Sequence, residues 1–124
     1  LGLADADTAL AEALDRWELA LFQHEPFRSE QLRASFQALL GGTWPLRAAV
    51  LLEPEPEARE RLHRQLVALG DGEEATTHCA DALRRALVEV LRHGDRPTLL
   101  RGLDRTLLGA GAADPAVAGR VSTA

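Results

Sequence analysis

Several residue types are missing or scarce in this chain, and each absence excludes a class of structure. Cysteine occurs once, which excludes an internal disulfide and a multi-cysteine zinc site. The longest apolar runs are far shorter than the roughly 20 residues that span a bilayer, so no membrane partner is expected. Lysine, asparagine, isoleucine, methionine and tyrosine are wholly absent. Their joint absence is typical of a GC-rich coding sequence, so the exclusive use of arginine is not a functional signal.

The 124 residues are enough for one domain with a real core. We expect a single helical domain over residues 1–124, either complete or a piece of a larger protein, because the chain begins at Leu1 rather than at methionine. No signal peptide is visible, so a cytoplasmic location is the default expectation.

The net charge of −5 is unevenly distributed. Residues 1–30 carry seven acids and two arginines, whereas residues 82–124 carry seven arginines and four acids. This asymmetry favours head-to-tail contact between copies, and hence a homo-oligomer. It does not indicate a nucleic-acid partner, because acids interrupt the basic segment and no aromatic residue accompanies it.

Residues 1–25 are predicted to form a first helix, which Asp5 or Asp7 can cap and Pro26 ends. Its apolar residues step by four, three and four, and His24 extends the series. The seam consists of Leu10, Leu14, Trp17 and Leu21. With only two heptads, packing within the domain is a better interpretation than a coiled coil.

A second helix is predicted from Ser29 to the stop at Gly41-Gly42, and Thr43 can cap a third. The expected apolar positions of the second helix are Leu32, Phe36, Leu39 and Leu40; those of the third are Leu46, Ala49, Val50 and Leu51. The run from Ala48 to Leu52 is uniformly apolar, which periodicity alone does not distinguish from a buried strand. Because no other segment looks like a strand, a helix is expected.

The best-defined pair of predicted helices spans residues 55–93 and turns at Gly70-Asp71-Gly72. The first helix carries the stripe Ala58, Leu62, Leu66 and Leu69, and Gly70 suits the C′ position after it. Asp71 and Glu74 resemble a capping box for the second helix. That helix has the apolar positions Ala75, Cys79, Ala82, Leu83, Ala86, Leu87, Val90 and Leu91, and it ends before Gly94.

After Gly94, Asp95 is predicted to cap a helix that ends at Gly109. Its apolar stripe is Leu99, Leu100, Leu103 and Leu107. Asp114-Pro115 opens a last short helix. The fold class is therefore all-α, with about six helices in antiparallel hairpins.

The residues Gly70-Asp71, Ala75, Cys79, Ala82 and Leu83 resemble the second half of a tetratricopeptide repeat. A partial second copy, Asp114, Ala118 and Ser122, repeats the spacing of Asp71, Ala75 and Cys79 after 43 residues, against about 34 in the standard repeat. The resemblance covers residues 55–124. It lacks the aromatic signature of the first repeat helix, so a generic helical bundle remains the alternative, and residues 1–52 are either degenerate repeats or an unrelated cap.

Candidate catalytic and metal-binding patterns have simpler structural explanations. Glu60 and His63 match half of a di-iron motif, but Glu60 lies opposite the apolar stripe and no second motif follows. His78 and Cys79 are adjacent on a helix and therefore diverge by about 100°. Cys79 lies on the packing stripe, where it is expected to be buried and inert. No enzyme activity, metal or cofactor is predicted.

We therefore expect a helical interaction or regulatory module that binds a segment of a partner protein. In tetratricopeptide proteins the polar side of the first repeat helix lines a groove, and here that side carries Glu57, Glu60, Arg64 and Val67. These are the predicted partner-binding residues. The alternative is a ligand-sensing domain with a pocket between the first two helices near Trp17, Phe36 and His24.

Overall fold

A computed structural model describes residues 7–112 of the chain. The helices in this part are α2 (Thr8–Phe22), α3 (Phe27–Leu40), α4 (Trp44–Leu52), α5 (Pro56–Gly70), α6 (Thr77–His93) and α7 (Arg96–Ala112). No strand occurs between residues 7 and 112, so the predicted all-α fold is confirmed, including a helix at α4 where a strand was the alternative. The short helix predicted at residues 114–124 lies outside the described residues.

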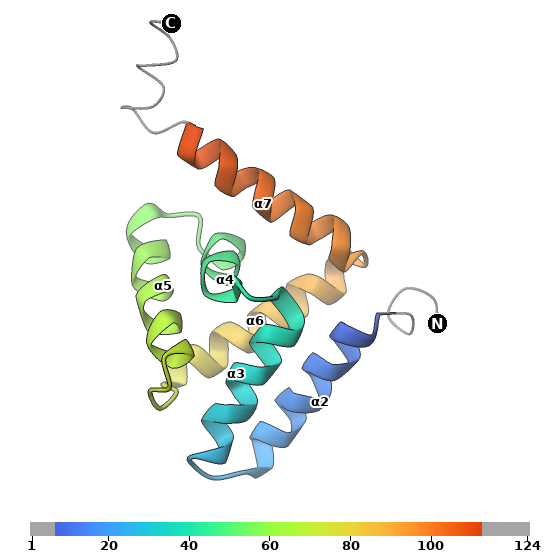
Figure 1. The fold of residues 1–124 in the computed structure, drawn as a ribbon, viewed down its shortest axis with the longest axis vertical. Coiled ribbons are helices and arrows are strands. Elements are labelled where there is room, and N and C mark those ends of the chain that lie inside the picture. The colour runs from blue at the N-terminus through green and yellow to red at the C-terminus, as the bar shows by residue number, and fades with distance from the viewer. Residues whose placement is uncertain (1–6, 113–124) are drawn as a thin grey trace, which may run out of the picture.

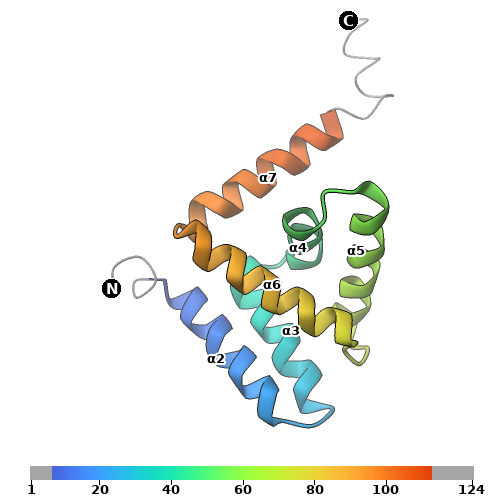
Figure 2. The same cartoon turned by 180° about the vertical axis from the view of Figure 1, so that it is seen from behind.

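The helices are arranged around α3 (Figures 1 and 2). α2 and α3 form an antiparallel pair, and α6 crosses them on the side that faces the viewer in Figure 2. α5 lies chiefly against α4, whereas α6 contacts α3 and α4, so the consecutive helices α5 and α6 make few direct contacts. α7 leaves the end of α6 and runs over α4. None of the described helices combines the length and apolar character needed to cross a bilayer.

One hydrophobic core joins α2 to α6, with α7 packed at its edge through Leu99 and Leu100. The rings of Phe36 and Trp44 stack at its centre, with centroids 4.7 Å apart and an interplanar angle of 12°. Of the predicted apolar positions on α3 and α5, Ala58 is half-buried and all the others are confirmed as buried: Leu32, Phe36, Leu39, Leu40, Leu62, Leu66 and Leu69. Helical spacing therefore identified the inward faces of these two helices correctly.

Most of the predicted positions on α6 are also buried, including Cys79, whose side chain is 2% exposed. Leu91 is exposed, and Ala75 precedes the helix. On α4 the inward face is Trp44, Ala48, Ala49 and Leu52, and Leu46, which the sequence placed on the stripe, is exposed. α4 is too short for its apolar residues to define a single face by spacing.

The predicted seam of α2 is confirmed at Leu10, Leu14 and Trp17, which are buried or packed against the core, but not at its end. Leu21, at the far end of the seam, is 58% exposed. The helix instead buries Ala13 and Ala20, because small side chains let α2 lie close to α3. α2 also ends at Phe22, earlier than predicted, so His24 lies in the connection rather than on the helix.

Two of the predicted helix ends around α6 and α7 are confirmed. Gly94 ends α6 with a φ of 82°, and the carboxylate of Asp95 accepts a hydrogen bond from the Thr98 amide at 3.2 Å. Asp7 caps α2 in the same way. α7 continues through Gly109, the predicted stop, because glycine inside a helix costs only about 1 kcal/mol and does not by itself end it.

The connection after α5 differs from the prediction in its register. Gly72, and not Gly70, has the positive φ, at 104°. The amides of Gly72 and Glu73 donate to the carbonyls of Leu69 and Ala68 at 3.1 and 3.0 Å. These two bonds form a Schellman motif with Gly72 at C′, so the turn begins two residues later than expected.

The predicted capping box at Asp71 and Glu74 is wrong, because α6 begins only at Thr77. The hydroxyl of Thr76 accepts a hydrogen bond from the Cys79 amide at 3.2 Å and caps the helix. Residues 73–76 lack helical structure.

Candidate functional site

A cleft of about 300 Å³ opens between α2 and α6 and has α3 as its floor. In Figure 2, α2 and α6 diverge toward the α2–α3 connection, whose residues Gln23 and His24 line the cleft. Its lining residues are Trp17, Ala20, Leu21, Phe22, Gln23, His24, Arg28, Leu32 and Ala80. Six of these nine residues are apolar, and the three polar ones, Gln23, His24 and Arg28, lie in the connection and at the start of α3.

The cleft follows from the side chains that α2 and α6 present to each other. Ala20 on α2 and Ala80 on α6 are too small to fill the space between the diverging helices. Trp17 is half-buried on one wall, and Leu32 is buried below it. The result is an apolar recess that opens to solvent at the end of α2.

One polar atom in this recess has no partner. The Oε1 atom of Gln23 is buried and accepts no hydrogen bond from any described residue. A buried amide oxygen without a donor costs about 1–3 kcal/mol, so such groups are rare in folded proteins. Gln23 also lines the cleft, so its side-chain oxygen would gain a partner if the side chain turned toward a group that entered there.

The base of the cleft is held rigid by the start of α3. The carboxylate of Glu25 accepts a hydrogen bond from the Ser29 amide at 3.0 Å and pairs with Arg28 at 3.5 Å. Hydrogen bonding from the Ser29 side chain is the main cause that lowers the pKa of Glu25, and Arg28 adds to it. The charge of Arg28 is thus already partnered within the chain.

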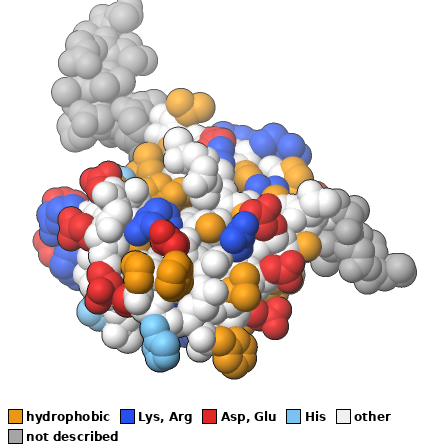
Figure 3. Space-filling model, turned by 60° about the horizontal axis from the view of Figure 1, so that its bottom comes forward, with side chains coloured by type: hydrophobic (Ala, Val, Ile, Leu, Met, Phe, Trp, Pro, Cys, Tyr) orange, Lys and Arg blue, Asp and Glu red, His pale blue; other side chains and the backbone are white. Residues whose placement is uncertain are grey.

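Two exposed apolar side chains stand at the edge of the cleft. Leu21 and Phe22 both line it, and Phe22 is 84% exposed. Figure 3 views the end of the molecule at which α2 and α3 are connected, and shows hydrophobic side chains standing among charged ones. Clustered exposed apolar residues of this size are typical of interaction surfaces rather than of an inert surface.

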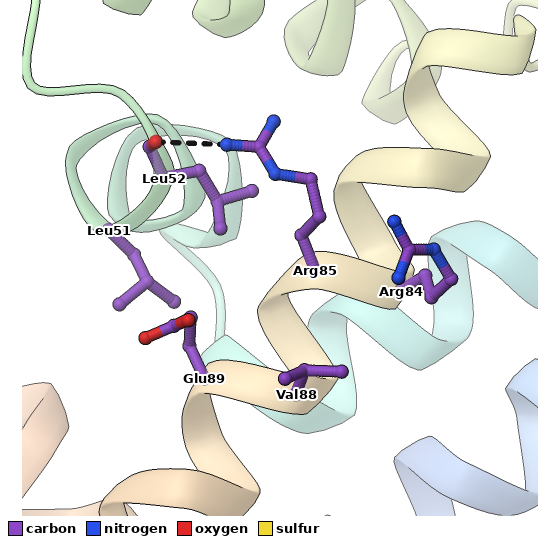
Figure 4. Close-up of a pocket in the computed structure, with 6 residues that line it drawn as sticks. All are labelled: Leu51, Leu52, Arg84, Arg85, Val88 and Glu89. Atoms are coloured by element: carbon purple, nitrogen blue, oxygen red, sulfur yellow. Dashed lines mark hydrogen bonds between the residues drawn. The ribbon is translucent and has the colours of Figure 1, made fainter.

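A second cleft, of about 290 Å³, lies between α4 and α6 and is lined by Leu51, Leu52, Arg84, Arg85, Val88 and Glu89 (Figure 4). Arg85 donates to the Leu52 carbonyl at 3.1 Å and pairs with Glu53 at 3.2 Å, and Arg84 pairs with Asp81 at 2.8 Å. Both arginines are engaged within the chain, so this cleft is a weaker candidate.

The predicted partner-binding residues Glu57, Glu60, Arg64 and Val67 all lie on the exposed side of α5. Glu60 and Arg64 form an ion pair of 2.9 Å with each other, and Val67 is 38% exposed. The structure thus brings these residues onto one face as expected. That face presents a single apolar side chain among charges, in contrast to the cleft.

The alternative ligand pocket was predicted near Trp17, His24 and Phe36. Trp17 and His24 do line the α2–α6 cleft, but Phe36 is fully buried against Trp44. Within residues 7–112, no three histidine, cysteine, aspartate or glutamate side chains are close enough together to hold a metal ion.

Gln23, Arg28 and Ala80 were not identified from the sequence, because no local spacing relates the end of α2 to the start of α6. Phe22 did carry a signal: a large apolar residue on the polar side of its helix, like Val67 on α5. No family model, curated protein or solved structure matches the chain. The tetratricopeptide resemblance therefore stays a prediction.

Proposed function

We propose that this protein is a helical interaction module that binds a segment of a partner protein in the α2–α6 cleft. The observation that carries this proposal is the buried, unpartnered Oε1 of Gln23 at an apolar recess. A peptide main chain supplies both a donor and an acceptor, so it can satisfy the side-chain amide of Gln23 in either orientation.

The partner segment is expected to carry an aliphatic or aromatic anchor. Such a side chain fits between Trp17 and Leu21, above Leu32. Clefts of this kind obtain most of their binding energy from one or two buried anchors, whereas the surrounding contacts exclude water. Phe22, which is exposed at the edge of the cleft, contributes to that outer ring of contacts.

A selection from a random peptide library tests the proposal, with binding measured by Trp17 fluorescence in a Trp44→Phe background. Selected peptides should carry an apolar anchor and shift the Trp17 emission. Gln23→Ala should weaken their binding at least about tenfold, because the main-chain amide then loses its partner. Leu21→Asp should abolish binding.

The α5 face provides the matched control. Val67→Asp combined with Arg64→Glu leaves the cleft untouched and should not change the affinity of cleft-binding peptides. Peptides that lose affinity only with these α5 variants would move the site to Glu57, Glu60, Arg64 and Val67, as the sequence predicted. A library that yields no binder would contradict the function itself.

A small ligand is the second candidate, because a cleft of about 300 Å³ is at the lower limit of small-molecule sites. Small apolar amides, screened by their effect on melting temperature, test this alternative. A melting-temperature rise that Gln23→Ala removes, without any peptide binder, would favour ligand sensing.

A further inference from the structure

The two most exposed large apolar side chains among the described residues occupy corresponding places on two different helices. Phe22 is the last residue of α2 and is 84% exposed, and Leu108 lies near the end of α7 and is 76% exposed. Burial of either side chain against a second surface is favourable, because it removes apolar area from water.

Charged residues of opposite sign precede these two side chains at matching intervals. Asp15 and Glu18 lie seven and four residues before the phenylalanine, whereas Arg101 and Arg105 lie seven and three residues before the leucine. All four are exposed. Seven residues make about two helical turns, so each set forms a stripe about 10 Å long on the outer face of its helix.

The two stripes cannot meet within one copy. α2 and α7 begin at the same corner, where the carboxylate of Asp7 lies 3.7 Å from the guanidinium of Arg96. From that corner the helices run toward opposite ends of the molecule (Figures 1 and 2). Within residues 7–112 the acidic stripe and the basic stripe therefore cannot pair with each other, whereas they can pair between two copies.

We propose that α7 of one copy docks along α2 of a second copy in a parallel orientation. Arg101 then lies beside Asp15, Arg105 beside Glu18, and Leu108 against Phe22. An antiparallel orientation would place the apolar residues against charges, so it does not satisfy both kinds of contact. Apart from Phe22, these residues lie outside the α2–α6 cleft, so this inference does not rest on the proposed function.

The interface is heterologous, because a different surface of each copy takes part. Each bound copy still presents its second stripe, so association continues into rings or open chains rather than stopping at a closed dimer. The contact is small, and we expect it to be populated only at high protein concentration.

Sedimentation velocity over a range of concentrations tests this inference on the full chain. The weight-average sedimentation coefficient of the wild type should rise with concentration. Arg101→Glu/Arg105→Glu should remain monomeric, as should Asp15→Arg/Glu18→Arg, because each variant places like charges together. An equimolar mixture of the two variants should associate again, since each reversed stripe then meets its complement.

The matched control is Arg61→Glu/Arg92→Glu, which reverses two exposed arginines on α5 and α6 and should associate like the wild type. Phe22→Ala should weaken association without changing net charge. Circular dichroism of every variant verifies that the fold is retained. A wild type that stays monomeric at all concentrations, or a mixture that fails to associate, would overturn the proposal.

Discussion

At the scale of single residues, Ser29 connects the two halves of the described chain. It is one of two buried polar residues in this part. Its hydroxyl oxygen accepts a hydrogen bond from the Ala75 amide at 2.8 Å, and its amide donates to Glu25 at 3.0 Å. One residue thus fixes the start of α3 through its main-chain amide and the approach to α6 through its side chain.

Ser29→Ala should lower the free energy of unfolding by about 1–3 kcal/mol, because the Ala75 amide loses its acceptor in a partly buried place. Urea unfolding measures the effect. Thr106→Ala is the control, since that exposed hydroxyl only bonds to the Gly102 carbonyl of its own helix. It should change stability by less than about 0.5 kcal/mol. Equal effects of the two substitutions would contradict a connecting role for Ser29.

The depressed pKa of Glu25 predicts acid sensitivity. Its folded pKa lies below the ordinary glutamate value of about 4.3, so the unfolded chain binds the proton more readily. The stabilisation is complete at neutral pH and is lost as pH falls from that value through the folded pKa. Glu25→Gln should therefore flatten the decrease in stability over this acid range, measured by urea unfolding at several pH values. If the free energy of unfolding depended on pH in the same way in the wild type and in Glu25→Gln, Glu25 would not be the source of the acid sensitivity.

At the scale of elements, helix positions were predictable from the sequence and helix ends were less so. The stripe of Leu62, Leu66 and Leu69 fixes the inward face of α5, because about 3.6 residues per turn leaves no other arrangement. The start of α6 has a local cap at Thr76, but it is also held by a hydrogen bond between Ala75 and Ser29, which are 46 residues apart. Local capping rules contain no information about such a partner.

Two glycine substitutions with opposite expected effects on stability test the position of the turn after α5. Gly72→Ala should destabilise the protein by about 1 kcal/mol, because φ is 104° there and a side chain is strained. Gly102→Ala lies inside α7 with open space around it, and should stabilise by up to about 1 kcal/mol. Thermal unfolding measures both. A stabilising Gly72→Ala would show that the Schellman turn is assigned wrongly.

At the scale of the whole molecule, α2 to α6 share one core, and this predicts cooperative unfolding. In a Trp17→Phe variant, Trp44 is the only tryptophan and reports on the centre of the core. Its fluorescence and the helical circular dichroism signal should change at the same urea concentration. A separate earlier loss of helix would mean that part of the chain unfolds independently.

The candidate cleft is formed by the packing of whole helices against one another. For this reason the sequence predicted only part of it. The exposure of Val67 follows from its place on one helix, and it was expected correctly. The cleft depends on the angle at which α6 crosses α2, so Gln23 and Ala80 become neighbours only in the folded chain.

The end of α3 has a consequence for the order in which the chain is made. Two carbonyls of its last turn, at Leu39 and Ala38, accept hydrogen bonds from Arg96, which lies 57 and 58 residues later. During synthesis from the N-terminus, the ribosome must deliver more than fifty further residues before this donor emerges. Until Arg96 emerges, water is the only donor available to those two carbonyls. The hydrogen bonds at the end of α3 are completed when α7 folds against it.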